Sequence, residues 1–169
     1  MIHLGLSNPK SPSNVGAIMR AAGCFGVDAV FYTGERYQQA ARFATDTKNH
    51  TDNIPLQHVA SLLDGVAEGM KIVAVELAEG ATPLPEFTHP EQACYLFGPE
   101  DGTLAQTLID KADAVVYIPT TSCLNLAATV NVLLYDRLAK SPLDFANDEL
   151  IRRSRDTNNR LQCHSDRPD

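Results

Sequence analysis

Four polar side chains lie beside glycines or small residues in otherwise apolar stretches, and their chemistry suits ligand binding: Asn14, Arg20, Glu100 and Asn125. The guanidinium of Arg20 must stay solvated or paired, and it can bind a phosphate or a carboxylate. Glu100 could pair with Arg20, while the two amides could position a ligand by hydrogen bonds. Each residue also has a structural interpretation, because Arg20 could be a surface arginine on a packing helix. The other three, Asn14, Glu100 and Asn125, could cap helices.

These side chains belong to three segments that are far apart in the chain. The segments read NVGAIMRAAGCFG over residues 14–26, LFGPEDG over residues 96–102 and IPTTSCLNL over residues 118–126. Functional loops in open parallel sheets gather at the carboxyl ends of strands. Glycine lets a backbone approach a ligand closely, and a helix N-terminus can hold the polar end of a ligand. Each signal is weak alone, and together they indicate one site.

Strand and helix patterns alternate around these segments, which favours a parallel α/β sheet. We predict strands over residues 2–6, 28–33, 71–77, 94–97 and 114–118, and helices over residues 14–25, 58–63, 103–112 and 124–138. Ser13 or Asn14 is expected to cap the first helix, and Gly26 to end it. Residues 35–53 have no clear assignment. Residues 78–92 are predicted to form a loop, and residues 154–169 a loose or disordered tail.

The bulk composition favours a soluble cytosolic protein of about one domain. A length of 169 residues is typical of a single domain. No apolar run approaches the ~18 residues that a membrane helix needs. The N-terminus is typical of a strand rather than of a signal peptide. The four cysteines lack the C-x-x-C spacing of a zinc site, so we expect buried, reduced thiols and no metal.

The net charge of −7 is unusual for a protein that binds nucleic acid, and it is unevenly distributed. Residues 1–50 carry five basic and three acidic side chains, residues 51–113 carry two and eleven, and residues 114–169 carry seven of each. A surface that faces phosphates is therefore expected in the N-terminal third and among the arginines near the C-terminus.

Taken together, the three segments resemble the three motifs of the SpoU (TrmH-like) family of SPOUT RNA 2′-O-ribose methyltransferases. The first segment matches N-x-G-A-I-x-R-x-A-x-x-F-G at every fixed position, and the others match G-P-E-D-G and I-P-T…L-N-L-A. The resemblance covers residues 2 to about 140. It implies a mostly parallel sheet with helices on both faces and a C-terminal trefoil knot. The methyltransferase domain would span residues 1–141, and residues 142–169 would form a polar, partly disordered extension.

The resemblance also implies that the chain binds S-adenosylmethionine (AdoMet) in the knotted C-terminal half of that domain. Backbone groups would hold AdoMet, by position at Val75, Gly98, Ile118 and Leu124. No metal would be needed, and a homodimer would bring two active sites to its interface. The chain lacks the glycine fingerprints G-x-G-x-x-G and G-x-x-x-x-G-K-[ST], which agrees with a cofactor site of this other type.

By the same resemblance, Arg20 is the central catalytic residue. A guanidinium stays protonated in proteins, so Arg20 would bind the adjacent phosphate and orient the 2′-hydroxyl rather than act as a base. Asn14 and Asn125 would position the ribose or Arg20, and Glu100 would orient Arg20. Cys123 stands where the family commonly has serine.

The RNA substrate is expected to be tRNA first and rRNA second. Recognition would come from the catalytic domain, the dimer groove and four arginines near the C-terminus: Arg152, Arg153, Arg155 and Arg160. The alternatives are a non-catalytic dimer of the same fold that binds RNA or AdoMet, and a methyltransferase that acts on a small molecule.

Overall fold

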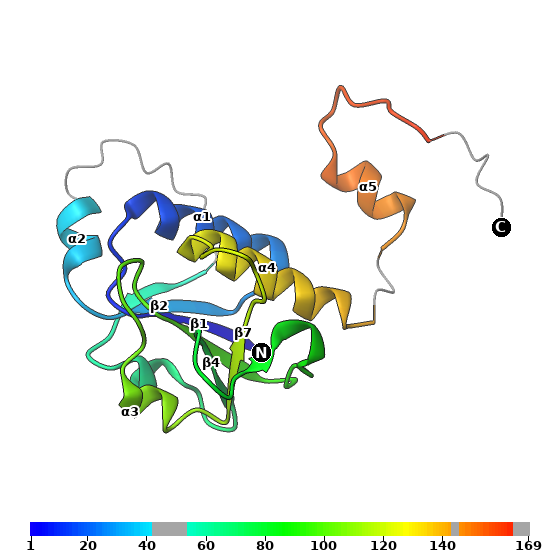
Figure 1. Cartoon of the computed structure of the whole chain (residues 1–169). Helices are drawn as coiled ribbons and strands as arrows, with labels where there is room; N and C mark the ends of the chain where they lie inside the picture. Colours follow the sequence, from blue (N-terminus) through cyan, green and yellow to red (C-terminus); the bar gives the residue numbers. More distant parts are fainter. Residues whose placement is uncertain (42–53, 143–145, 164–169) are drawn as a thin grey trace.

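The computed structural model describes residues 1–41, 54–142 and 146–163. Over these residues the chain forms a seven-stranded sheet in the order β3-β2-β1-β6-β4-β7-β5, and all neighbouring strands run parallel (Figure 1). The strands are β1 (Ile2–Leu6), β2 (Ala29–Tyr32), β3 (Leu56–His58), β4 (Lys71–Val75), β5 (Thr82–Pro83), β6 (Ala93–Phe97) and β7 (Ala114–Tyr117). The predicted parallel α/β class is therefore confirmed.

Three neighbouring strands end at the same level of the sheet. Phe97, the last residue of β6, pairs in register with Leu6 of β1 and with Val75 of β4. Val75 in turn pairs with Val116 of β7. From β1 the sheet grows through β2 and β3 on one side and through the later strands on the other. Such a switch in strand order is where ligands bind in open parallel sheets, beyond the carboxyl ends of the strands.

Both faces of the sheet are covered, as β6 shows most clearly, because every one of its residues is buried. Side chains alternate between the faces of a strand. Tyr95 and Phe97 belong to the core beneath α1 (Pro12–Phe25) and α4 (Leu126–Ala139). Cys94 and Leu96 belong to a second core on the side of α3 (Gln106–Ile109). Figure 1 shows α1 and α4 side by side on one face and α3 on the other.

Helix α1 begins earlier than predicted. Ser11 is its N-cap and accepts a hydrogen bond from Asn14 N at 3.3 Å, and proline follows at the first helical position, which it favours. Gly26 ends the helix at φ 66°, in the left-handed region that glycine tolerates best. The apolar face repeats at helical spacing and is buried: Val15, Ile18, Met19 and Ala22. Since Ser11 caps the helix, the Asn14 side chain is available for other contacts.

Helix α4 begins two residues later than predicted, because Asn125 is its N-cap. The Asn125 side chain accepts a hydrogen bond from Ala128 N at 2.8 Å. The buried face of α4 then packs toward α1 and the sheet with five residues: Leu126, Ala127, Val130, Leu133 and Leu134. This packing fixes residues 118–125, the segment that leads into the helix, at the carboxyl edge of the sheet.

Several local predictions were wrong. Residues 58–63 do not form a helix: β3 ends at His58, and a short 3-10 helix η1 (Leu62–Gly65) follows, with Ser61 and Asp64 forming a capping box. Pairing of β3 with β2 overrides the weak helical pattern. The predicted loop 78–92 contains β5 and the 3-10 helix η2 (Leu84–Glu86). The helix expected over 103–112 is only the short α3.

The segments without a clear prediction contain two more helices. Helix α2 (Arg36–Ala41) begins the stretch 35–53, whose residues 42–53 lie outside the described part of the chain. Helix α5 (Asp148–Ser154) begins in the polar extension behind its N-cap Asn147. Residues 155–163 of the expected tail contain neither helix nor strand, and residues 164–169 lie outside the described residues.

Two further expectations concern membranes and thiols. None of the helices in the described residues is long and apolar enough to cross a membrane.

The expectation of buried thiols holds for Cys94 alone, because Cys24, Cys123 and Cys163 are exposed in the isolated chain. Burial raises the pKa of the Cys94 thiol to about 12, so this group stays protonated and inert.

Candidate active site

A cavity of about 340 Å³ opens at the carboxyl edge of the sheet, where β4, β6 and β7 end. Its volume is in the range of small-molecule sites, roughly 300–1,000 Å³. Seven of the eight residues predicted for the site line this cavity: Asn14, Val75, Gly98, Glu100, Ile118, Leu124 and Asn125. The three segments selected from the sequence therefore meet at one place, and Arg20 is the predicted residue that does not line it.

The walls of the cavity combine apolar surface with two carboxylates. Val75 and Phe97 end their strands and Ile118 directly follows β7, whereas Leu124 and Leu126 lie at the entry to α4. Glu76 and Glu100 also line the cavity, whereas no lysine, arginine or histidine among the described residues does. Such walls suit a ligand with a flat apolar part that is neutral or positively charged.

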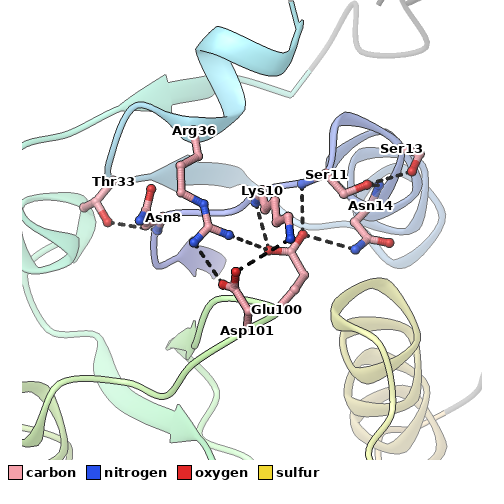
Figure 2. A network of polar contacts seen from close by, with 9 residues as sticks. All are labelled: Asn8, Lys10, Ser11, Ser13, Asn14, Thr33, Arg36, Glu100 and Asp101. Atoms are coloured by element: carbon pink, nitrogen blue, oxygen red, sulfur yellow. Dashed lines mark hydrogen bonds and ion pairs between the residues drawn. The ribbon is translucent and has the colours of Figure 1, made fainter.

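Glu100 fastens the loop between β1 and α1 to the loop after β6 (Figure 2). Its carboxylate accepts hydrogen bonds from Lys10 N at 2.8 Å, Ser11 N at 3.1 Å and Asn14 Nδ2 at 3.1 Å. Burial by itself would raise the pKa of Glu100, but these donors and the residue's own backbone N–H outweigh burial and lower the pKa. Glu100 is therefore an ionised anchor that sets the position of Asn14.

The arginine beside Glu100 in the same chain is Arg36 of α2, not Arg20. Arg36 Nη1 donates to Asp101 Oδ1 at 2.9 Å, and Arg36 Nη2 lies 3.9 Å from Glu100 Oε2. Lys10 Nζ lies 3.7 Å from Asp101 Oδ2, so a second cation also faces this carboxylate (Figure 2). The hydrogen bond from Arg36 is the main cause that lowers the pKa of Asp101. Sequence reasoning missed Arg36, which stands in a polar stretch with no motif.

Arg20 lies on a different side of α1 from Asn14. It is exposed and is not part of the cavity lining. Six positions along an α-helix correspond to a rise of about 9 Å and a turn of about 240°. When Asn14 faces the cavity of its own chain, Arg20 consequently faces away from it.

Asn125 has the capping role that its position in the sequence allowed. Its Oδ1 accepts the hydrogen bond from Ala128 N, and its side chain also lines the cavity. Capping uses the amide oxygen, so the amide NH₂ group is the part that can face a ligand. Cys123, two residues earlier, lines the cavity as well and is exposed.

Glu76 is the site residue that sequence reasoning missed. It directly follows β4, and its Oε2 accepts a hydrogen bond from Leu104 N at 2.8 Å, while Oε1 accepts one from Leu77 N at 3.0 Å. A Cβ atom on Gly98 would lie 3.0 Å from Glu76 Oε2 and 3.2 Å from Leu104 N, so a larger residue would crowd this carboxylate. The signal that could have found Glu76 is a single acid at the end of an apolar strand.

Comparison with known proteins identifies the family. The fold and the cavity define a parallel α/β protein that binds a small ligand at the switch point of its sheet. Residues 1–135 match the family model of the SpoU rRNA Methylase family. The chain belongs to this family.

Two curated relatives illustrate the range of the family. The chain is 29% identical over 136 residues to the 23S rRNA (guanosine(2553)-2'-O)-methyltransferase RlmP of Bacillus subtilis, covering 75% of this chain and 53% of that protein. It is 28% identical over 134 residues to the tRNA (guanosine(18)-2'-O)-methyltransferase of Escherichia coli, covering 74% and 57%. The chain thus spans about half the length of these relatives.

Solved structures share the fold. A structure that concerns the 2-OH methylation of C/U34 on tRNA has a TM-score of 0.65 at 27% identity, over 82% of this chain and 89% of that chain. The SpoU methyltransferase AviRb from Streptomyces viridochromogenes, in complex with the cofactor AdoMet, has a TM-score of 0.62 at 21% identity, over 81% and 59%. At this level of identity, AviRb supports the fold alone.

Proposed function

We propose that this chain is an RNA 2′-O-ribose methyltransferase that uses AdoMet. The observation that carries the proposal is the convergence of the three segments, residues 14–26, 96–102 and 118–126, around one cavity. Membership of the SpoU rRNA Methylase family supports it, as do the two relatives described above, which are both named as guanosine 2'-O-methyltransferases.

AdoMet fits the cavity by size and by charge. Apolar walls from Val75, Ile118 and Leu124 can enclose an adenine ring, and Gly98 lets the backbone come close to the nucleoside. A positively charged ligand meets two carboxylates and no cationic side chain of the described residues. When bound, AdoMet supplies an already activated methyl group, so the protein needs mainly to position the reactants.

The protein's own side chains would position the ribose. Asn14 donates its amide N–H to Glu100, which leaves its Oδ1 to accept a hydrogen bond from the 2′-hydroxyl. The Asn125 amide, which also lines the cavity, would hold the same ribose. Arg20 would bind the adjacent phosphate and stabilise charge on the reacting oxygen, because a guanidinium stays protonated.

A homodimer explains why Arg20 does not line the cavity of its own chain. Helices α1 and α4 lie side by side, and α4 exposes two large apolar side chains, Val132 at 40% and Tyr135 at 64%. In a two-fold dimer the same surface meets itself. Pairing through α1 and α4 would bury these side chains and bring Arg20 of one subunit to the site of the other.

A trefoil knot is part of the proposal, with a domain over residues 1–141 and an extension over residues 142–169. Contacts between α4 and the segment before β6 support it. Arg137 donates to the carbonyl oxygens of Pro90 and Glu91 at 2.6 and 2.8 Å, and Lys140 donates to those of Leu84 and Phe87 at 2.6 and 3.0 Å. The end of α4 is thus fastened against the chain between β4 and β6, as a threaded segment would be.

The preferred substrate is tRNA, with rRNA as the second choice. The structure related to C/U34 methylation on tRNA supports this order, because this chain covers 89% of it. The exposed arginines of the extension, Arg152, Arg153 and Arg160, and the basic side chains of the N-terminal third would contact phosphates. An RNA substrate of this kind would place the enzyme in the cytoplasm.

Incubation with methyl-labelled AdoMet and purified tRNA or rRNA tests the proposal. We expect label in RNA that becomes acid-soluble after ribonuclease treatment, and a 2′-O-methylated nucleoside after complete digestion. Label in a ribonuclease-resistant small molecule would favour the small-molecule methyltransferase. Binding of AdoMet or RNA without transfer to either RNA would favour the non-catalytic dimer.

A further inference from the structure

Glu76 is a half-buried carboxylate on the cavity whose charge is not balanced by a nearby cation. None of the ion pairs among the described residues involves Glu76. The other carboxylate of the cavity, Glu100, differs because three donors and the Arg36 guanidinium surround it. Glu76 has two backbone donors but no cation beside it, so hydrogen-bond donors that a ligand brings would stabilise its charge further.

The position of this carboxylate is fixed by its neighbours. Leu104 N and Leu77 N each donate to one of its two oxygens, and Gly98 packs against Oε2. A carboxylate has about four acceptor positions, so roughly two remain for a ligand. Two acceptor positions on a fixed carboxylate suit a pair of neighbouring hydroxyl groups.

The proposed site places the methyl group and the adenosine of AdoMet at different parts of the cavity. Asn14 and Glu100 mark the side where the RNA ribose is proposed to enter, so the methyl group must face them. The adenosine end then lies among the strand ends, where Glu76 directly follows Val75. A carboxylate after a parallel strand binds ribose hydroxyls in other nucleotide sites, by the same geometry.

We propose that Glu76 accepts hydrogen bonds from the ribose hydroxyls of AdoMet and so selects a nucleoside donor with an intact ribose. The inference rests on the proposed function, because it assumes that AdoMet occupies this cavity. Glu76 does not contact the sulfonium in this arrangement. A carboxylate against the sulfonium would stabilise a charge that disappears during methyl transfer, which would slow the reaction.

The test measures binding by isothermal titration calorimetry, without RNA. The ligands are AdoMet, the neutral product S-adenosylhomocysteine, and the 2′-deoxy and 3′-deoxy forms of that product. Glu76→Ala should weaken AdoMet and S-adenosylhomocysteine by the same factor, about tenfold to a hundredfold for hydrogen bonds to a charged group. Glu79→Ala, an exposed acid on the same loop, is the matched control and should change neither affinity.

The deoxy ligands identify the contact. Each should bind more weakly than S-adenosylhomocysteine to the wild-type chain, and the difference should largely vanish in Glu76→Ala, because coupled groups are not additive. Two results would overturn the inference. One is that the deoxy ligands lose the same affinity relative to S-adenosylhomocysteine in the wild-type chain and in Glu76→Ala. The other is that Glu76→Ala weakens the binding of AdoMet but not that of S-adenosylhomocysteine. If Glu76→Ala does not fold, undiminished binding of both deoxy ligands to the wild-type chain would overturn it. Failure of AdoMet and its product to bind the wild-type chain would instead overturn the proposed function.

Discussion

Asn14 Nδ2 lies 3.1 Å from Glu100 Oε1, although 86 positions separate the two residues in the chain. The same carboxylate holds the backbone N–H groups of Lys10 and Ser11. One side chain therefore positions both the entry to α1 and the amide that is proposed to bind the ribose.

Glu100→Ala removes this anchor. We expect a loss of about 1–3 kcal/mol in the free energy of unfolding, because half-buried donors lose their acceptor. We also expect methyl transfer to fall by at least roughly tenfold, because Asn14 is no longer held. Urea unfolding and transfer assays measure the two effects. Glu68→Ala, which replaces an exposed acid that does not line the cavity, is the control, and equal behaviour of both variants would contradict the anchoring role.

Arg20→Ala should abolish methyl transfer and leave AdoMet affinity nearly unchanged, because Arg20 does not line the cavity. Calorimetry and transfer assays separate the two properties. An equal loss of AdoMet affinity would argue against the phosphate-binding role.

Mixed dimers test whether Arg20 acts across the interface. Arg20→Ala and Gly98→Val should each be inactive alone. When mixed and allowed to exchange subunits, they should recover roughly a quarter of wild-type activity, because half of the dimers are heterodimers with one complete site. That expectation requires Arg20 to serve the partner's cavity. If Arg20 served its own, the heterodimer would contain no complete site, and the mixture would stay inactive.

Gly98→Ala should weaken AdoMet binding by about tenfold, because the new Cβ would lie 3.0 Å from Glu76 Oε2 and 3.2 Å from Leu104 N. The second neighbour is backbone and cannot easily move. Gly23→Ala is the control, since its Cβ would meet only Ile54 Cδ1 at 4.0 Å. Similar AdoMet affinities for the two variants in calorimetry would show that the cavity does not depend on this contact.

His89 makes stability depend on pH. Burial lowers its pKa, although the hydrogen bond from His89 Nε2 to Asp136 opposes the shift. Below about pH 6.5 the unfolded chain binds a proton that the folded chain resists, so the free energy of unfolding should decrease as the pH falls. His89→Gln should reduce the difference in urea midpoint between pH 7.5 and 5.5. His58→Gln, at an exposed histidine, is the control. If His89→Gln leaves the difference in urea midpoint between the two pH values unchanged, His89 is not the source of the pH dependence.

The local sequence determined the main strands, the two long helices and the positions that line the cavity. Apolar runs such as Ile72–Val75 specify buried parallel strands, and the residue after each strand must lie at the carboxyl edge. This rule, with the motif resemblance, was enough to select Gly98 and Ile118. It could not select the short β3, whose pairing with β2 is a long-range interaction.

The tertiary structure alone decided which polar groups meet. The sequence suggested Arg20 as a partner for Glu100, but the fold brings Arg36 there and turns Arg20 away. It also placed the Glu76 carboxylate against Leu104 N. The physical reason is that periodicity and capping report on interactions within a few residues, whereas these contacts depend on how loops from separate strands pack at one edge of the sheet.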